Sequence, residues 1–268
     1  MISARTRLLG VIGHPIDHSL SPKMHNAAFV VEARDYVYLP MDVSSEDLAV
    51  AVSGLRALGF RSFNVTMPHK QTILPLLDNI DEVARVSGAV NTVLVKNYEL
   101  HGFNTDGSGF VEACKESKVE FADRRVLVLG AGGAASAIAV ALCGEGTREL
   151  QIIDQSTERA EELRSKLHEL DTKTRVEAYT VKTLDETALE TEVIINATPL
   201  GMRKEDPLPV PPGYLERDKA VCDAVYLRPR LPSSDKLANE ALASFLVGGC
   251  CCTREFRRKE SGPDKSRT

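Results

Sequence analysis

The amino-acid sequence predicts an α/β chain of two domains. Short apolar segments alternate with helical stretches at the start of the chain, which predicts a small α/β domain over residues 1–106. A second alternation contains residues 125–129 (RVLVL), a continuous apolar run typical of a parallel strand with both faces buried. Because a glycine-rich loop follows that run directly, we expect a dinucleotide-binding domain over residues 107–226, with residues 227–268 as a tail.

The composition is that of an ordinary globular chain and narrows the function classes. The net charge of −5 gives no reason to expect nucleic acid or an anionic membrane as a partner. The sequence has neither a basic-then-apolar leader nor an apolar run long enough to cross a bilayer, so we expect a cytoplasmic protein. Three adjacent cysteines at 250–252 fit neither a disulfide framework nor the usual spacing of zinc ligands, and no metal site is predicted.

The elements of the first domain are bounded by turn and capping residues. The first strand ends at Gly13 and Pro15, which favour turns. Ser44 and Ser45 precede an amphipathic stretch that ends at Leu58, and hydroxyls in that place cap the start of a helix. The expected strands lie at 6–12, 36–43, 63–66, 91–96 and 100–104, and the expected helices at 23–32, 44–58 and 83–89.

The second domain has the order strand, glycine loop, helix, strand that is typical of a Rossmann-type dinucleotide-binding unit. A helix near residues 107–117 leads into it. The expected strands lie at 125–129, 150–153 and 193–196, and the expected helices at 135–142 and 157–170. The N-terminal α/β domain is then left to bind the substrate.

The glycine loop has the pattern G-x-G-x-x-A, with Ala135 in the third small position. Gly130 permits the tight turn, Gly132 lets backbone N–H groups approach a pyrophosphate, and Ala135 allows the helix to pack closely on the strand. The alternative is a purely structural turn, but the strands and helix around the loop favour nucleotide binding.

An acidic residue, Asp154, stands at the end of the second strand of this unit. A carboxylate there accepts from the 2′-hydroxyl of the adenosine ribose and repels a 2′-phosphate, which favours NAD over NADP. The alternative role is a cap for the following helix, although Ser156 can fill that role.

Polar side chains gather at the ends of several expected strands and at the start of the first helix of the first domain. Hydroxyl, amide, ammonium and carboxylate groups that converge at strand ends would suit a polyol that bears an acid. Each residue alone could instead be a turn residue or a helix cap. The clusters contain Ser19, Ser21, Asn64, Thr66, Lys70, Asn91 and Asp106.

Seven motifs make the chain resemble the shikimate dehydrogenase family from Leu8 to Tyr226. They are, in order, SLSPKMHNAAF, NVTMPHK, GAVNTV, GFNTDGSGF, GAGGAASA, NATPLGM and DAVY. The resemblance implies a reversible reduction of 3-dehydroshikimate to shikimate, in the pathway to aromatic amino acids. The implied partner is therefore a small molecule, and the implied assembly is a monomer or a homodimer.

The resemblance also implies roles for individual residues. Lys70 would be the catalytic acid and base, with Asp106 orienting it, ahead of the rival acids His14, His18, His25 and His69. The implied substrate-binding residues are Ser19, Ser21, Asn64, Thr66, Asn91 and Tyr226. The implied cofactor-binding residues are Gly130, Ala131, Gly132, Gly133, Ala134, Asp154, Thr198 and Met202.

One departure from the family leaves the cofactor open between NADP and NAD. Most members have Asn-Arg-Ser or Asn-Arg-Thr after the second strand, and the arginine holds the 2′-phosphate of NADP. This chain has Asp154, Gln155 and Ser156 there, which leans toward NAD. Two alternatives therefore stay open: an NAD-dependent quinate/shikimate dehydrogenase, and a catalytically inactive metabolite sensor on the same fold.

The tail beyond Tyr226 does not resemble the family, and a shifted reading frame is a hypothesis that explains it. When permitted codons from Leu227 onward are read in the adjacent frame, the translation includes P-P-A-T-P, M-L-L-Y-Q and W-T-G, which the family shows in that order. Because the family's tail completes the substrate pocket, we expect a destabilised chain with weak or no activity. Sequencing the gene tests this: we expect a one-base deletion near the Leu227 codon, and an intact frame without a family-like downstream reading would contradict it.

Overall fold

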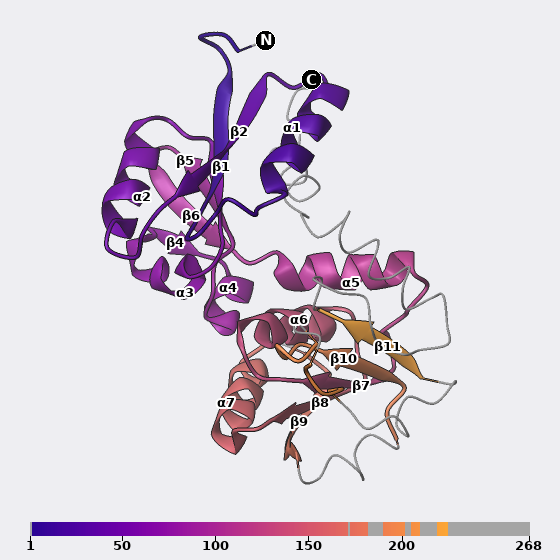
Figure 1. Cartoon of the computed structure of the whole chain (residues 1–268). Coiled ribbons are helices and arrows are strands. Elements are labelled where there is room, and N and C mark those ends of the chain that lie inside the picture. Colours follow the sequence, from indigo (N-terminus) through magenta and orange to yellow (C-terminus); the bar gives the residue numbers. More distant parts are fainter. Residues whose placement is uncertain (1, 171, 182–189, 202–204, 210–218, 225–268) are drawn as a thin grey trace, which may run out of the picture. The chain divides into compact units, whose positions relative to one another are not determined.

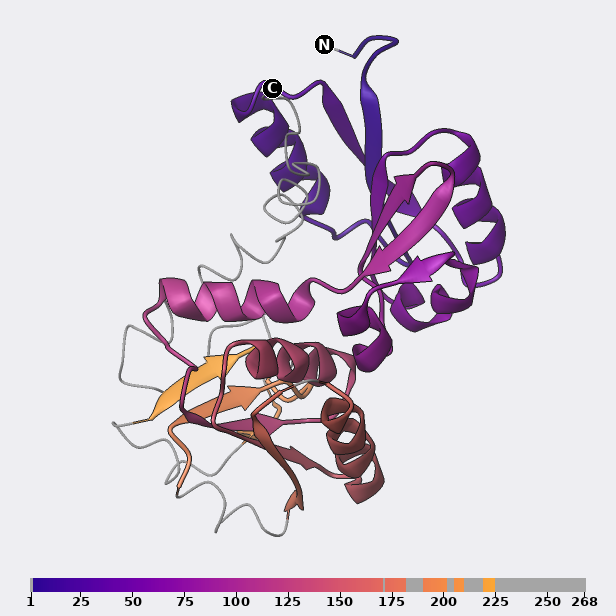
Figure 2. The same cartoon turned by 180° about the vertical axis from the view of Figure 1, so that it is seen from behind.

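A computed structural model describes residues 2–170, 172–181, 190–201, 205–209 and 219–224. These residues form two compact units, the first ending at Thr105 and the second beginning at Asp106. Figures 1 and 2 show the helices and strands of both units from opposite sides. Met202, Tyr226 and the tail, for which the sequence makes specific predictions, lie outside the described residues.

Unit 1 contains a six-stranded sheet in the order β2-β1-β3-β5-β6-β4. Its strands are β1 (Arg7–Gly13), β2 (Tyr36–Asp42), β3 (Ser62–Val65), β4 (Asn79–Ile80), β5 (Thr92–Lys96) and β6 (Glu99–Phe103). Its helices are α1 (Ser21–Val31), α2 (Leu48–Ala57), α3 (His69–Thr72), the 3₁₀ turn η1 (Leu74–Leu76) and α4 (Glu82–Ser87).

The direction of the strands brings several polar segments to one edge of this sheet. β1 is parallel to β2 and β3, so their carboxyl ends lie at the same edge. β5 is antiparallel to both β3 and β6, with Thr92 opposite Asn64 on one side and Phe103 on the other. The start of β5 and the end of β6 therefore lie beside the end of β3. We call this row, formed by the ends of β1, β2, β3 and β6 and the start of β5, the polar edge of unit 1.

Alternation along β1 builds two hydrophobic layers, one on each face of the sheet. Leu9 and Val11 point to one face and are buried with Phe29 of α1. Ile12 points to the other face and is buried in a cluster that contains Val52 of α2. A strand covered on both faces must be apolar where it is covered, and this explains the apolar run of β1 from Leu8 onward, after the exposed Arg7.

Unit 2 contains a five-stranded parallel sheet in the order β11-β10-β7-β8-β9. The chain moves from β7 outward to β8 and β9, and then returns to the other side of β7 with β10 and β11. The strand order therefore reverses between β7 and β10, and ligands of such sheets bind at that crevice. The elements are α5 (Asp106–Glu116), β7 (Arg125–Leu129), α6 (Gly133–Gly144), β8 (Glu149–Asp154), α7 (Thr157–His168), β9 (Arg175–Thr180), β10 (Val193–Asn196) and β11 (Ala220–Asp223).

Close packing holds α5 against α6 within unit 2, as both views show (Figures 1 and 2). A Cβ atom added at Gly107 would lie 2.0 Å from the carbonyl oxygen of Ala137. No side chain fits at that distance, so a glycine is required for the two helices to approach this closely. The position of Asp106, the first residue of α5, is therefore set by its own unit.

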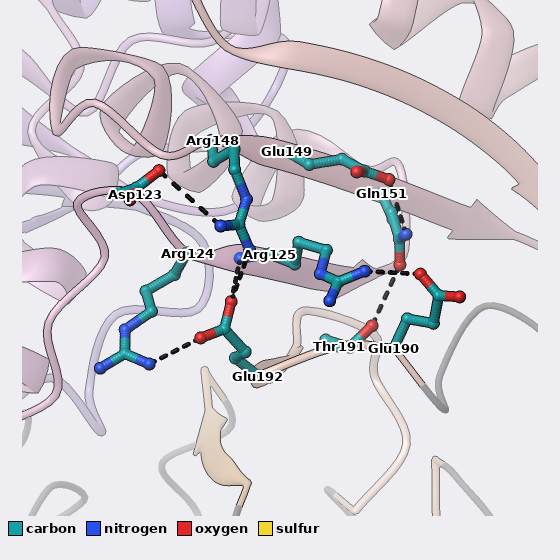
Figure 3. A network of polar contacts seen from close by, with 9 residues as sticks. All are labelled: Asp123, Arg124, Arg125, Arg148, Glu149, Gln151, Glu190, Thr191 and Glu192. Atoms are coloured by element: carbon teal, nitrogen blue, oxygen red, sulfur yellow. Dashed lines mark hydrogen bonds and ion pairs between the residues drawn. The ribbon is translucent and has the colours of Figure 1, made fainter.

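A polar network fastens the amino ends of β7, β8 and β10, at the edge opposite the switch-point crevice (Figure 3). Glu192 accepts from Nη1 of Arg124 at 2.6 Å, from Nη2 of Arg148 at 3.0 Å and from the backbone N–H of Arg125 at 3.0 Å. The backbone N–H of Arg125 and the side chain of Arg124 lower the pKa of the Glu192 carboxyl. Because the pairs are partly exposed, each is worth about 1 kcal/mol at most, and the network mainly fixes the strand register.

Most of the expected elements are confirmed, and β7 has the bounds that the sequence predicts. Helix α2 begins later than predicted, at Leu48, because Ser44 and Asp47 bond to each other and form a turn before it. The sequence did not predict α3, η1, β4, β9 or β11. Among the described residues, no helix is long and apolar enough to cross a membrane.

Candidate functional site

Lys70 lies in the short helix α3, just past the polar edge of unit 1. The backbone N–H of Thr66 donates to Ile12 of β1 at 3.0 Å, which keeps the segment before α3 in the sheet. The carbonyl oxygen of Lys70 accepts from the backbone N–H of Val90 at 2.8 Å. The half-buried Lys70 is therefore held between the connections that follow β3 and precede β5.

The histidines that compete with Lys70 are arranged differently from one another. His69 is fully buried and its Nε2 lies 2.7 Å from the carbonyl oxygen of Val43, so its ring braces α3 from inside. His25 is also buried, stacked on Tyr38. His14 and His18 are exposed, and His14 pairs with Asp42 at 2.8 Å.

Asn91 ties the start of β5 to the end of β6. Its Oδ1 accepts from the backbone N–H of Thr105 at 3.0 Å, and its Nδ2 lies 3.1 Å from Oγ1 of Thr105. Both residues are buried, so these bonds are protected from competition by water. Asn64 joins the same group, because its Nδ2 donates to the carbonyl oxygen of Asn91 at 3.1 Å.

Ser19 and Ser21 lie at the start of α1, where the backbone N–H of Ser21 donates to Oγ of Ser19 at 3.3 Å. The Ser19 hydroxyl thus contacts the backbone of Ser21 at the start of the helix. Asp106 follows Thr105 directly and is the first residue of α5 in unit 2. A carboxylate in the first turn of a helix is favoured by the helix dipole.

The glycine loop of unit 2 makes the tight turn that the sequence predicts. Gly130 has a φ of +105°, and a Cβ there would lie 3.0 Å from the carbonyl oxygen of Ala197, so only glycine fits. Gly132 is the N-cap of α6, and a Cβ on Gly132 or Gly133 would meet open space. The N-terminus of α6 is therefore accessible to a pyrophosphate, and Ala131 and Ala134 lie in the same turn.

Thr198 lies on the opposite side of the switch-point crevice, after β10. Its Oγ1 donates to Oδ1 of Asn196 at 2.7 Å, and its methyl group would be 3.3 Å from a Cβ on Gly130. The structure therefore brings Thr198 and Gly130 together.

Asp154 is more heavily engaged than the sequence suggests. Its carboxylate accepts from the backbone N–H groups of Ala131 at 2.8 Å and Ser156 at 2.9 Å, and from Nη2 of Arg159 at 2.6 Å. Burial opposes ionisation, but the donors outweigh it and lower the pKa of Asp154. Ser156 caps α7 by accepting from the backbone N–H of Arg159 at 3.2 Å, as predicted.

Sequence reasoning missed Arg159. In the family pattern the arginine stands directly after the position of Asp154. In this chain the arginine that reaches the Asp154 carboxylate comes five residues later, from the first turn of α7. The Arg159 side chain is 59% exposed. Arg159 stands three residues after the capping Ser156, which is about one helical turn, and this spacing was the signal in the sequence that could have predicted its contact.

Unit 2 is a parallel sheet with a glycine turn at its switch point, and unit 1 gathers hydroxyl, amide and ammonium groups. These features are typical of a nicotinamide-dependent oxidoreductase that acts on small polar substrates. Family models agree with this class. The "Shikimate dehydrogenase substrate binding domain" matches residues 11–93, and "Shikimate / quinate 5-dehydrogenase" matches residues 112–201. The chain belongs to the shikimate dehydrogenase family.

Known relatives extend over most of the chain. A shikimate dehydrogenase (NADP(+)) from Rubrobacter xylanophilus is 54% identical over 226 residues, which are 84% of this chain and 79% of the relative. Shikimate 5-dehydrogenase from Listeria monocytogenes, solved in complex with shikimate and NAD, has a TM-score of 0.84 at 31% identity, covering 96% of this chain and 93% of that one. Quinate dehydrogenase from Corynebacterium glutamicum, in complex with NAD, has a TM-score of 0.76 at 34% identity, covering 91% and 86%.

The buried His25 predicts an acid-sensitive unit 1. Burial lowers the pKa of His25 from 6.5 to about 4. The unfolded chain then binds the proton more readily, so stability is present above the unfolded pKa and is lost as the pH falls through the folded pKa. The loss from this residue is about 3 kcal/mol.

Urea denaturation near neutral pH and near the folded pKa of His25 measures this loss. Between these two pH values the free energy of unfolding should fall in both chains. We expect the fall in the parent chain to be about 3 kcal/mol larger than the fall in His25→Phe. The exposed His18→Gln serves as the matched control and should keep the parent's pH dependence. An equal loss in His25→Phe and the parent would show that another group carries the sensitivity.

Proposed function

We propose that the chain interconverts 3-dehydroshikimate and shikimate, at a rate that the altered tail lowers, with Lys70 as the acid and base and Asp106 orienting it. The observation that carries the proposal is the polar edge of unit 1. Asn64, Thr66 and Asn91 are gathered there, α3 holds Lys70 directly beyond it, and Thr105 leads straight into Asp106. A ring with several hydroxyls needs such a row of fixed donors and acceptors.

The hydroxyls of Ser19 and Ser21 would suit the substrate carboxylate, since two hydroxyl donors from the start of one helix can bind its two oxygens. Thr66 and Asn91 would take the ring hydroxyls. Their backbones are fixed by the sheet, so the substrate meets groups that need little reorganisation.

Lys70 would supply the proton that the reduction requires. The chemistry supplied by a bound nicotinamide dinucleotide is hydride transfer. As the ketone is reduced, negative charge builds on its oxygen, and the ammonium group of Lys70 donates a proton from Nζ to that oxygen. In the reverse direction, neutral Lys70 takes the proton from the hydroxyl. The Asp106 carboxylate would hold the ammonium group in line.

The glycine loop would hold the dinucleotide. Backbone N–H groups from Ala131 to Ala134 at the start of α6 suit the pyrophosphate, and Thr198 closes the other side. Met202 and Tyr226 keep their predicted roles in the cofactor and substrate sites, although both lie outside the described residues.

We propose that the site accepts both NAD and NADP, with the pair formed by Asp154 and Arg159 setting the preference. The Asp154 carboxylate lies where a ribose hydroxyl would be read, and its charge disfavours a 2′-phosphate. Arg159 offsets that charge at 2.6 Å and presents a half-exposed guanidinium, a group suited to phosphate. The named cofactors of relatives agree with a mixed preference, because one is NADP(+)-dependent and another was solved with NAD.

Quinate is the second candidate substrate. The similarity to a quinate dehydrogenase solved with NAD supports it, together with the carboxylate at position 154. Assays of shikimate and quinate with NAD and with NADP separate the two proposals. The combination of substrate and dinucleotide with the highest kcat/KM identifies the preferred substrate.

Replacing Lys70 with Ala should lower kcat for shikimate oxidation by roughly 10²–10⁴-fold, because the proton acceptor is removed. The rate is measured by the absorbance of the reduced dinucleotide. Lys96→Ala is the matched control, because Lys96 is exposed at the far end of β5. An unchanged rate in Lys70→Ala would remove its catalytic role and favour the metabolite sensor.

Replacing Asp154 with Asn should tighten NADP binding relative to NAD by roughly tenfold, because the negative charge is lost while Arg159 becomes available to a phosphate. Calorimetric titration of both dinucleotides gives the ratio of dissociation constants without any need for turnover. Glu158→Gln is the control, since Glu158 is an exposed neighbouring carboxylate. A ratio that stays constant, or moves toward NAD, would refute the role of Asp154.

A further inference from the structure

A relay of side-chain hydrogen bonds reaches the polar edge of unit 1 from Tyr38, the third residue of β2, and passes through Thr92; the predicted site includes neither residue. Oη of Tyr38 donates to Oδ1 of Asn64 at 2.6 Å. Nδ2 of Asn64 donates to Oγ1 of Thr92 at 3.1 Å, and Oγ1 of Thr92 donates to Oδ1 of Asn91 at 3.0 Å. The relay ends at Thr105, whose backbone N–H and side chain both contact the Asn91 amide. It therefore joins β2, β3, β5 and the end of β6.

Two backbone groups fix the orientation of both amides. The carbonyl oxygen of Asn91 can only accept, so the atom of Asn64 that lies 3.1 Å from it must be the nitrogen. The backbone N–H of Thr105 can only donate, so the atom of Asn91 that lies 3.0 Å from it must be the oxygen. Neither amide can be flipped without placing two donors or two acceptors against each other.

The hydroxyl protons follow from these fixed ends. Thr92 receives a hydrogen bond from Nδ2 of Asn64, so its single proton is directed to Oδ1 of Asn91. Tyr38 faces the oxygen of Asn64 and must donate to it. Each hydroxyl thus transmits the orientation of one amide to the next group along the edge.

The framework around the relay is rigid. Tyr38 is only 2% exposed and stacks on His25, with ring centroids 4.3 Å apart. Its backbone N–H and carbonyl oxygen are both bonded to the side chain of Asn26 at 2.9 Å. Thr92 lies directly opposite Asn64 in the ladder between β3 and β5, so the sheet register itself sets their contact.

We propose that Tyr38 and Thr92 are positioning residues that orient the amides of Asn64 and Asn91 for the substrate. This rests on the proposed function, in which those two amides meet the substrate. Each amide keeps one orientation, so the substrate would meet the same pattern of donors and acceptors in every molecule.

Two substitutions of Thr92 with nearly the same volume separate positioning from packing. Thr92→Val removes the hydroxyl and keeps the branched shape, whereas Thr92→Ser keeps the hydroxyl and loses a methyl group. We expect the dissociation constant for shikimate, measured by calorimetry, to rise roughly tenfold in Thr92→Val and to stay within about twofold in Thr92→Ser. Tyr38→Phe should weaken binding in the same direction.

Kinetics give a readout that a loss of stability alone would not produce. Where turnover is measurable, KM for shikimate should rise in Thr92→Val while kcat changes little, because Lys70 is untouched. Shikimate binding by Thr92→Val equal to that of the parent, or equal weakening in Thr92→Val and Thr92→Ser, would overturn the proposal.

A second measurement tests the relay without any substrate. The side-chain amide protons of Asn64, which donates to Thr92, should exchange slowly with solvent in ¹H–¹⁵N spectra of the parent and of Thr92→Ser, and more quickly in Thr92→Val. Slow exchange in Thr92→Val would overturn the relay. A parent chain that shows slow exchange but binds no shikimate would instead overturn the proposed function and keep the relay.

Discussion

The hydrogen bond from the backbone N–H of Thr105 to Oδ1 of Asn91 is the interaction on which the site of unit 1 depends. Both residues are buried, so an unpaired N–H there would cost about 1–3 kcal/mol. The bond fixes the position of Thr105, which lies between the end of β6 and Asp106. The residue before Asn91 donates to the backbone of Lys70, so the same short segment also holds α3. Two neighbouring residues thus hold the two segments of the proposed catalytic pair, Asn91 through its side chain and Val90 through its backbone.

In unit 2, the geometry of the backbone shapes the proposed dinucleotide site. The left-handed turn at Gly130 lies against Ala197 where the strand order reverses, and it opens the N-terminus of α6. The carboxylate of Asp154 stabilises the same turn from the other side, because it accepts the backbone N–H of Ala131. The residue proposed to choose between the dinucleotides therefore also supports the loop proposed to hold them, and its charge is balanced by Arg159.

Local patterns predicted the parts of the molecule that local chemistry decides. The sequence predicted β7 because a strand buried on both faces is a continuous apolar run. It predicted Ser156 as a helix cap because hydroxyl side chains favour the N-cap position. Thr92 and Tyr38 could not be predicted as site residues from the sequence. Thr92 contacts Asn64 through the ladder between β3 and β5, and the Tyr38 side chain reaches Asn64 across β1, so both contacts join distant segments. The four-residue α3 is too short to show a period, and Arg159 reaches Asp154 only because α7 turns it back.

The central claim is that the polar edge of unit 1 binds a hydroxylated ring acid through fixed donors and acceptors. The most direct test is a calorimetric titration of the unmodified chain with shikimate, and with benzoate as a ring acid that has no hydroxyls. We predict saturable one-to-one binding of shikimate and no measurable binding of benzoate at the same concentrations. Equal binding of the two acids, or no binding of shikimate by the folded chain, would contradict the claim.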